Sequence, residues 1–222
     1  MKIDFSAYCS RSELVFHSKL ILISVASACK ELSIISHIED IGVKLNQQKY
    51  IQINSKFKTN VDGIFAIGDV VPGPMLAHKA EEEGVACVEI IKGQKPHINY
   101  DFIPAIVYTN PEVASVGKTE SQLKEAKIDY KVGKFPFMAN GRALTTSSSE
   151  GFVKILADSK TDQILGAHII GHDAGQLIAE IVTTMEFGGS SEDIARICHA
   201  HPTTSEAVKE AAMSVDGRAI HI

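Results

Sequence analysis

The segment at residues 63–84 limits the possible folds more than any other part of the sequence. It begins with an apolar run, IFAIGD, which predicts a short strand that ends abruptly at Gly68 and Asp69. After the loop VVPGP, a helix rich in Ala and Glu is expected at about residues 75–91. The sequence thus predicts a strand that leads through a glycine-containing turn into a helix.

The turn between this strand and helix suits a ligand that carries hydroxyl or phosphate groups. Gly68 allows close approach to the backbone, and the Asp69 carboxylate can accept hydrogen bonds from ribose-like hydroxyls. The start of the helix, near Met75, offers free N–H groups at the positive end of the helix dipole. The residues alone leave a second interpretation open, because a Gly-Asp pair after a strand also occurs in a turn with an Asx cap.

The charge balance argues against nucleic-acid binding. The 222 residues include 22 Lys and Arg against 27 Asp and Glu, a formal charge of −5, so no basic footprint is expected. Hydrophobic residues make up 45% of the chain, which suits one or two domains with packed cores. The longest apolar run, at residues 20–29, is far shorter than the roughly 20 residues that a membrane-spanning helix needs. We therefore expect neither a nucleic-acid partner nor a membrane span.

The same apolar run carries two further predictions. Residues 20–25 predict a buried strand of the parallel-sheet kind, because they lack polar alternation. The following ASAC only faintly resembles an export signal, since the preceding residues include Asp4 and Glu13, and no export is expected. The cysteines at positions 9, 29, 87 and 198 are too widely spaced for a CxxC or CxxxxC pair, which favours a reducing compartment. Cys9 and Cys29 are each expected to be lone buried thiols, and no metal site is predicted.

The second half of the sequence has a different pattern, and a domain boundary is expected near residue 100. Strands are predicted at residues 105–109, 130–137, 152–156 and 164–170, among three helical stretches. The polar turn at residues 158–162 favours antiparallel pairing of its flanking strands. This pattern indicates an α+β domain with a mostly antiparallel sheet.

Three of the predicted helix starts carry recognisable signals. Thr119 and Gln122 fit a capping box, and Asp173 is expected to cap a helix that ends near Phe187. The last helix is expected to begin after Pro202 and to end near Val215.

The string CHAHPTTSEAVKEA at residues 198–211 holds the candidate for acid/base chemistry. Pro202 disfavours helical conformation at His201, so His201 is expected just before the helix and Glu206 in its first turn. A carboxylate there can accept the imidazole N–H, set its tautomer and make the histidine a better base. A cap in which Glu206 pairs with Thr203 is an equal alternative from the residues alone, and one carboxylate oxygen for each partner would make the two compatible. His199 is expected to be structural.

Several strings are similar to one family. TNVDGIFAIGDVVPGPMLAHKAEEEG, residues 59–84, resembles the second flavin-binding segment of the pyridine nucleotide-disulfide oxidoreductases. HAHPTTSEA resembles the His–Glu motif of the dihydrolipoamide dehydrogenases within that family. The strings at residues 104–125 and 131–143 resemble its dimerisation domain, and the resemblance extends from about residue 42 to residue 222.

The resemblance implies a fold, an activity and a set of site residues. The implied activity is the FAD-dependent reoxidation of dihydrolipoamide with NAD, with His201 as acid/base and Glu206 as its partner. The implied cofactor-binding positions are Gly68, Asp69, Met75, Leu76, Ala77 and His78. The implied partners are a second copy, bound through residues 101–222, and a 2-oxo acid dehydrogenase complex. In such a homodimer the His–Glu pair of one chain reaches the flavin site of the other.

The implied fold class is an α/β remnant of the FAD- and NAD-binding domains followed by an α+β dimerisation domain. Residues 1–50 correspond to a degenerate tail of the NAD-binding domain, residues 51–100 to the C-terminal segment of the FAD-binding domain, and residues 101–222 to the dimerisation domain. The first of these departs from the family, because ASAC at residues 26–29 stands where a Gly-Arg-x-Pro motif is usual.

Three motifs of the family are absent from the sequence, namely both GxGxxG fingerprints and the CxxxxC redox pair. The FAD site is therefore partial, the NAD motif is missing, and the chain resembles a C-terminal fragment that is expected to be inactive alone. The alternative is a non-catalytic dimerisation or assembly module that acts with a separate N-terminal companion chain. A glutathione or mercuric reductase relative fits the strings at residues 59–84 and 131–143 less well. The implied compartment is a bacterial cytoplasm or a mitochondrial matrix.

Overall fold

The chain forms two compact units, Met1–Ile98 and Asn99–Ile222, each with its own sheet. The structure, a computed structural model, describes residues 13–17, 20–25 and 38–222. The predictions for Cys9, Cys29 and the ASAC segment concern positions outside these described residues, so they stay predictions.

The first unit contains a three-stranded sheet in the order β1-β2-β3. Strand β1 (Glu13–His17) is antiparallel to β2 (Leu20–Val25), and β2 is parallel to β3 (Ile64–Gly68). The strand predicted at residues 20–25 and its parallel pairing are thus confirmed. A short 3-10 helix, η3 (Glu39–Ile41), lies between β2 and β3 along the chain.

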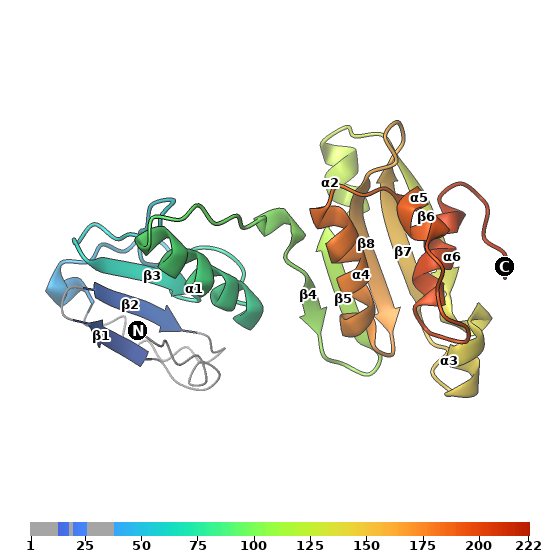
Figure 1. Ribbon diagram of the computed structural model, residues 1–222, viewed down its shortest axis with the longest axis horizontal. Coiled ribbons are helices and arrows are strands. Elements are labelled where there is room, and N and C mark those ends of the chain that lie inside the picture. Colours follow the sequence, from blue (N-terminus) through green and yellow to red (C-terminus); the bar gives the residue numbers. More distant parts are fainter. Residues whose placement is uncertain (1–12, 18–19, 26–37) are drawn as a thin grey trace. The chain divides into compact units, whose positions relative to one another are not determined.

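Helix α1 (Ala77–Ile91) follows β3 along the chain and packs against it (Figure 1). It begins two residues after the predicted start near Met75, because Leu76 has extended backbone angles and serves as the N-cap residue. The buried face of α1 combines apolar and charged side chains: Lys79, Ala80, Glu83, Ala86 and Cys87. Lys79 and Glu83 are charged residues that usually face solvent on a surface helix, but here both are buried inside this unit.

The second unit contains a five-stranded sheet in the order β4-β5-β8-β7-β6, in which every neighbouring pair is antiparallel. Its strands are β4 (Ala105–Val107), β5 (Glu112–Gly117), β6 (Tyr130–Pro136), β7 (Phe152–Asp158) and β8 (Ile164–Gly171). Four of them confirm predicted strands, and the turn between β7 and β8 confirms the antiparallel pairing. Strand β5 was not predicted, because EVASVG contains a glycine and small residues and has only two β-branched side chains.

Helices cover one face of this sheet. Figure 1 shows α4 (Ala174–Glu186), α5 (Ser191–Arg196) and α6 (Glu206–Ser214) on that face. The remaining elements of the unit are the short helices η4 (Tyr100–Phe102), α2 (Glu120–Glu125), η5 (Phe137–Ala139) and α3 (Gly141–Thr145). Alternate strand residues such as Val153, Ile155 and Ile169 form one core with Ile181 of α4 and Val208 of α6.

A glycine brings α6 close to the sheet. An added Cβ at Gly133 of β6 would lie 2.0 Å from the carbonyl oxygen of Ala211, so only glycine permits this approach. The C-terminal half of α6, at Ala211 and the C-cap residue Val215, therefore packs closely against β6, which forms one edge of the sheet.

The predicted helix caps have different outcomes. Thr119 and Gln122 form the expected capping box at the start of α2. Asp173 is the N-cap residue of α4, but the prediction that its side chain caps the helix is wrong. Asp173 is left-handed, with φ of 60°, and its carboxylate pairs with Nδ1 of His172 at 2.9 Å. The N–H of Gly175 instead donates to Oε2 of Glu112 on β5 at 2.9 Å.

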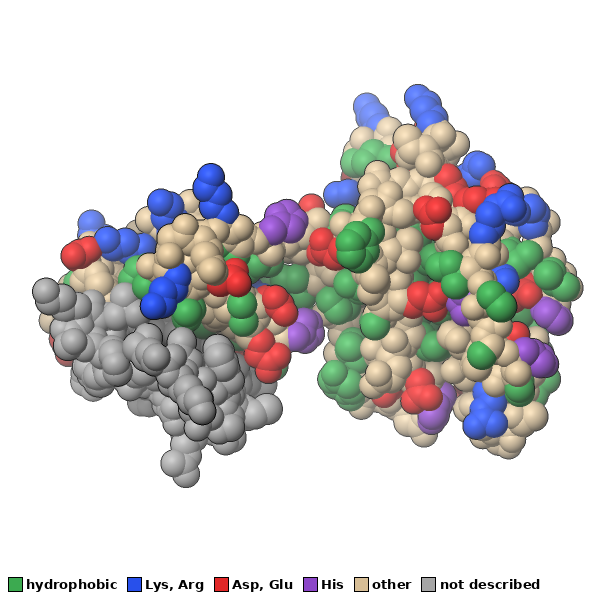
Figure 2. Space-filling view, viewed as in Figure 1, with side chains coloured by type: hydrophobic (Ala, Val, Ile, Leu, Met, Phe, Trp, Pro, Cys, Tyr) green, Lys and Arg blue, Asp and Glu red, His purple; other side chains and the backbone are tan. Residues whose placement is uncertain are grey.

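The predicted class, an α/β unit followed by an α+β unit with an antiparallel sheet, is confirmed. Within the described part of the chain, no helix is both long and apolar enough to cross a bilayer. Acidic and basic side chains are interspersed over the visible face of Asn99–Ile222 (Figure 2).

Candidate functional site

The first part of the candidate site is the turn that follows β3. Gly68 ends the strand with φ of 74°, a left-handed conformation that glycine adopts without steric cost. Its carbonyl accepts a hydrogen bond from the N–H of Val71 at 3.3 Å, which closes the turn. Asp69 follows directly and is half-buried. The sequence predicted both the position of this turn and the residues that form it.

The other predicted cofactor-binding residues lie where α1 begins. Met75 is exposed, Leu76 is the N-cap residue, Ala77 starts the helix, and His78 is half-buried. Leu76 provides no side-chain acceptor, and the first turn contains no acidic residue. The N–H groups at the start of this helix form a donor set suited to a polar or anionic group. A half-buried carboxylate and this donor set together fit a cofactor that carries hydroxyls.

Two charged residues of α1 that no sequence motif indicates hold Gly68. Oε2 of Glu83 accepts a hydrogen bond from the Gly68 N–H at 2.7 Å, and Nζ of Lys79 donates to the Gly68 carbonyl at 3.2 Å. Nζ of Lys79 also lies 3.2 Å from Oε1 of Glu83, and both side chains are almost completely buried. Their four-residue spacing, in phase with the apolar positions of α1, was the only signal in the sequence.

Cys87, one turn further along α1, is buried and free. Burial, together with the nearby charge of Glu83, raises the pKa of its thiol to about 11. The thiol therefore stays protonated near neutral pH, and it is a poor nucleophile.

The second part of the candidate site is the His201–Glu206 pair in the other unit. Nδ1 of His201 lies 2.9 Å from Oε1 of Glu206, and the N–H of Thr203 donates to Oε2 of the same carboxylate at 2.8 Å. The expected geometry, with one oxygen for each partner, is thus present. The full capping box is absent: the N-cap residue of α6 is Ser205, whose side chain makes no capping hydrogen bond, and the Thr203 hydroxyl donates to the Ala200 carbonyl. Helix α6 begins only at Glu206, later than predicted.

The electrostatics of the pair favour an ionised Glu206. Partial burial alone would raise the pKa of Glu206, but the hydrogen bonds from the Thr203 N–H and from His201 outweigh it and lower the pKa below its usual value. His201 is largely exposed, at 73% of its side-chain surface. An ionised carboxylate that accepts from Nδ1–H leaves Nε2 as the nitrogen that can exchange a proton with a ligand.

Asn140 is a residue of this site that the sequence did not reveal. It is buried, and its Nδ2 donates to the Thr203 carbonyl at 3.0 Å. Its Oδ1 accepts from the N–H of Ala143 at 2.9 Å and so caps α3. One side chain therefore ties α3 to the segment between His201 and Glu206. No local pattern could have indicated this contact, because 63 residues separate Asn140 from Thr203.

His199 has a different environment from His201. Its side chain is 6% exposed, and Nε2 lies 2.7 Å from Oε1 of Glu180 on α4. Nδ1 lies 3.1 Å from the carbonyl of Ile197. Both ring nitrogens are engaged inside the unit, which agrees with the structural role expected for this histidine.

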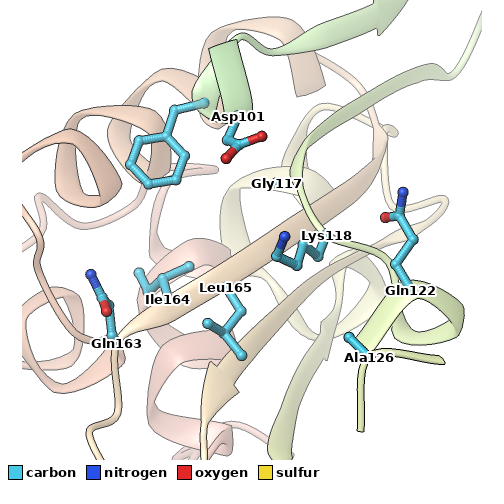
Figure 3. A pocket seen from close by; sticks show the side chains of 9 residues that line it. Asp101, Gly117, Lys118, Gln122, Ala126, Gln163, Ile164 and Leu165 are labelled. Carbon is cyan, nitrogen blue, oxygen red and sulfur yellow. The ribbon is translucent and has the colours of Figure 1, made fainter. Parts of the chain in front are cut away.

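A pocket of about 330 Å³ lies elsewhere in the second unit. Its lining includes Asp101, Lys118, Gln122 and Gln163, whose side chains surround the space in Figure 3. None of the predicted site residues lines this pocket, so it gives no support to the predicted chemistry.

Comparison with known families and proteins gives consistent matches over both units. Residues 103–212 match the model of the pyridine nucleotide-disulphide oxidoreductase dimerisation domain, and residues 14–84 match the model described as pyridine nucleotide-disulphide oxidoreductase. Together these two matches include most of the chain.

Similar individual proteins are dihydrolipoyl dehydrogenases and a flavoprotein reductase. The mitochondrial dihydrolipoyl dehydrogenase of Pisum sativum is 58% identical over 186 residues, which are 84% of this chain and 37% of the relative. The dihydrolipoyl dehydrogenase of Cupriavidus necator is 55% identical over 83% of this chain and 39% of the relative. The solved structure of RclA from Escherichia coli, an HOCl-induced flavoprotein disulfide reductase, has a TM-score of 0.73 and 25% identity over 78% of this chain and 40% of its own. The chain thus spans little more than a third of the length of the curated relatives it matches.

Proposed function

Because the chain belongs to the pyridine nucleotide-disulphide oxidoreductase family, we propose that it acts as the C-terminal part of a dihydrolipoyl dehydrogenase. The observation that carries this proposal is the His201–Glu206 pair, with 2.9 Å between Nδ1 and the carboxylate. In the whole enzyme, two copies join through residues 101–222, and the pair of one copy serves the redox site of the other. FAD and NAD are the cofactors of that assembly.

In this proposal His201 is the acid/base toward the substrate dithiol. Glu206 holds Nδ1–H, so Nε2 takes the proton from one thiol of dihydrolipoamide. The thiolate attacks one sulfur of a cysteine disulfide, forms a mixed disulfide and releases the other cysteine as a thiolate. The second substrate thiol then gives its proton to the cysteine thiolate already released, and its sulfur displaces the cysteine held in the mixed disulfide, which closes the substrate disulfide. His201 returns its proton to the displaced cysteine. Both cysteines, which this chain does not supply, end reduced.

The first unit would hold part of the FAD. Asp69 accepts hydrogen bonds from hydroxyls of the ribityl chain, and Gly68 allows the close approach. The backbone at Met75, Leu76, Ala77 and His78 contributes the contacts near the flavin. When bound, FAD passes the two electrons from the reduced cysteines toward NAD.

Substitution of His201 tests this proposal in the assembled enzyme. His201→Gln removes the proton acceptor and should lower the rate of dithiol oxidation by about 10²–10⁴-fold, the usual contribution of general acid/base catalysis. Circular dichroism should show unchanged folding, because His201 is largely exposed. His172→Gln is the matched control, since His172 is also exposed and paired with a carboxylate. Wild-type turnover of the His201→Gln enzyme would refute the assignment.

The isolated chain should bind FAD weakly and show no lipoamide turnover. The glycine-rich half that grips adenine and pyrophosphate is not in this sequence, and each tenfold loss of affinity corresponds to about 1.4 kcal/mol of lost binding energy. Native mass spectrometry of the purified chain should show a flavin-free dimer. Retention of one FAD per chain through a desalting column would contradict this expectation.

A companion chain separates the catalytic proposal from the assembly-module alternative. The companion would carry the CxxxxC pair and the GxGxxG fingerprints of the family. Lipoamide turnover by the mixture supports the catalytic role, whereas a stable but inactive complex supports the assembly module. We place the whole enzyme in a 2-oxo acid dehydrogenase complex, in a mitochondrial matrix or a bacterial cytoplasm, as the relatives suggest.

A further inference from the structure

The buried Lys79–Glu83 pair contacts both polar backbone groups of one residue, Gly68. The Glu83 carboxylate accepts the Gly68 N–H at 2.7 Å, and the Lys79 ammonium donates to the Gly68 carbonyl at 3.2 Å. The two charges also lie 3.2 Å apart. Because Gly68 immediately precedes Asp69, the pair fixes both peptide groups of Gly68, including the one that leads into Asp69.

The burial of this pair requires a reason beyond helix stability. Lys79 and Glu83 are exposed by 1% and 2% of their side-chain surface, and desolvation of two charges offsets much of their mutual attraction. An apolar pair of similar volume at the same positions would often be as stable or more stable. The two charges are therefore informative, because each of them contacts the Gly68 backbone.

The order of the two charges along α1 also indicates that they are placed to contact the Gly68 backbone. In an isolated helix, a glutamate four residues before a lysine is the more favourable arrangement, because it complements the helix dipole. Here the lysine comes first, in the first turn of α1, where the dipole disfavours a positive charge. The positions of the Gly68 N–H and carbonyl require this reversed order, since an acceptor must face the former and a donor the latter.

We propose that Lys79 and Glu83 are positioning residues that hold the Gly68–Asp69 turn in the conformation that receives the flavin. This inference rests on the proposed flavin site. In this inference the buried ion pair preorganises the turn. Without the pair, the turn's conformation would depend on the positive φ of Gly68. Neither side chain needs to touch the cofactor.

Two double variants isolate the hydrogen bond from the charge. Lys79→Met/Glu83→Gln and Lys79→Met/Glu83→Leu both remove the buried ion pair, so both should fold. They differ in whether residue 83 retains an oxygen that can accept the Gly68 N–H. Amide hydrogen exchange at Gly68, followed by NMR on the full chain, should stay slow in the Gln variant and become at least tenfold faster in the Leu variant. Equilibrium titration with FAD, performed on each variant mixed with the companion chain and followed by flavin fluorescence, should give at least a tenfold higher Kd for the Leu variant.

A charge exchange provides the second comparison. Lys79→Glu/Glu83→Lys keeps an ion pair and improves its order in the helix, but it sets a donor against the Gly68 N–H and an acceptor against the carbonyl. Faster exchange at Gly68 and weaker FAD binding are expected, and loss of folding would also support the requirement for the native order. The matched control is Lys58→Asp/Asp62→Lys, an exposed pair of the same unit with the same spacing, which should leave both readouts unchanged.

Amide exchange at Gly68 tests the positioning role, and FAD affinity tests the flavin site, so the two proposals can fail separately. Equal Gly68 exchange in the Gln and Leu variants overturns the positioning role, even if FAD binds. Faster exchange in the Leu variant, with no FAD binding by the wild-type chain even when the companion chain is present, supports the hold on the turn and overturns the flavin site. Unequal exchange with equal FAD affinity overturns the functional part of the inference.

Discussion

At the scale of single residues, Glu206 performs two tasks because its carboxylate has two oxygens. One oxygen faces His201, and the other accepts the Thr203 N–H, so the orientation of the carboxylate is fixed before any ligand arrives. The five-residue spacing in HAHPTTSE made this arrangement predictable, since Pro202 and a helix start place the two side chains together. The tether from Asn140 was not predictable, because it comes from a distant part of the chain.

The role of Asn140 can be tested by replacing the NH2 group of its side chain with an oxygen. Asn140→Asp keeps the oxygen that caps α3, but it removes the donor to the Thr203 carbonyl and places two acceptors against each other. We expect the free energy of unfolding to fall by about 1–3 kcal/mol, the cost of an unsatisfied buried polar contact. Urea denaturation monitored by circular dichroism would measure it.

A second asparagine provides the control for this measurement. Asn99→Asp makes the same change at the N-cap of η4, where the asparagine side chain accepts from the Asp101 N–H. That change should alter stability by less than about 0.5 kcal/mol, as is usual for exposed positions. If the Asn140→Asp variant is as stable as the wild type, the tether does not contribute to stability.

At the scale of elements, helix ends depend on partners that may be close or distant in sequence. The α2 capping box was predictable because Thr119 and Gln122 are three residues apart. The start of α4 at Asp173 was predicted correctly, but its side-chain cap was not, because the acceptor, Glu112, belongs to β5, which the sequence pattern did not indicate. Strand β5 forms because β4 and β8 flank it on both sides, a pairing that local propensity does not contain.

The two candidate caps of α4 should respond differently to substitution. Glu112→Ala removes the acceptor of the Gly175 N–H and should lower the free energy of unfolding by about 0.5–2 kcal/mol, like the loss of an ordinary N-cap. Asp173→Asn keeps a residue that tolerates φ of 60° and should change stability by less than about 0.5 kcal/mol. Denaturant titrations of both variants would measure the difference. A larger loss for Asp173→Asn than for Glu112→Ala would contradict the structural assignment.

At the scale of the whole molecule, the sequence predicted both architectures but only the local half of the site. Strands with apolar runs and helices with caps are recognisable from neighbouring residues, as at β3, α1 and α2. The buried charges at Lys79 and Glu83 were not recognisable, because Lys and Glu in a helix usually lie on the solvated face. Burial is a property of the packed unit, so this part of the site required the structure.

The five-stranded sheet has two edges, and both discourage the addition of a foreign strand. Strand β4 has only three residues, and β6 carries Lys131, Lys134 and Pro136. Short length, lysines and proline are the features with which natural edge strands avoid edge-to-edge aggregation. The second unit is therefore built to resist aberrant β-assembly through the open edges of its sheet.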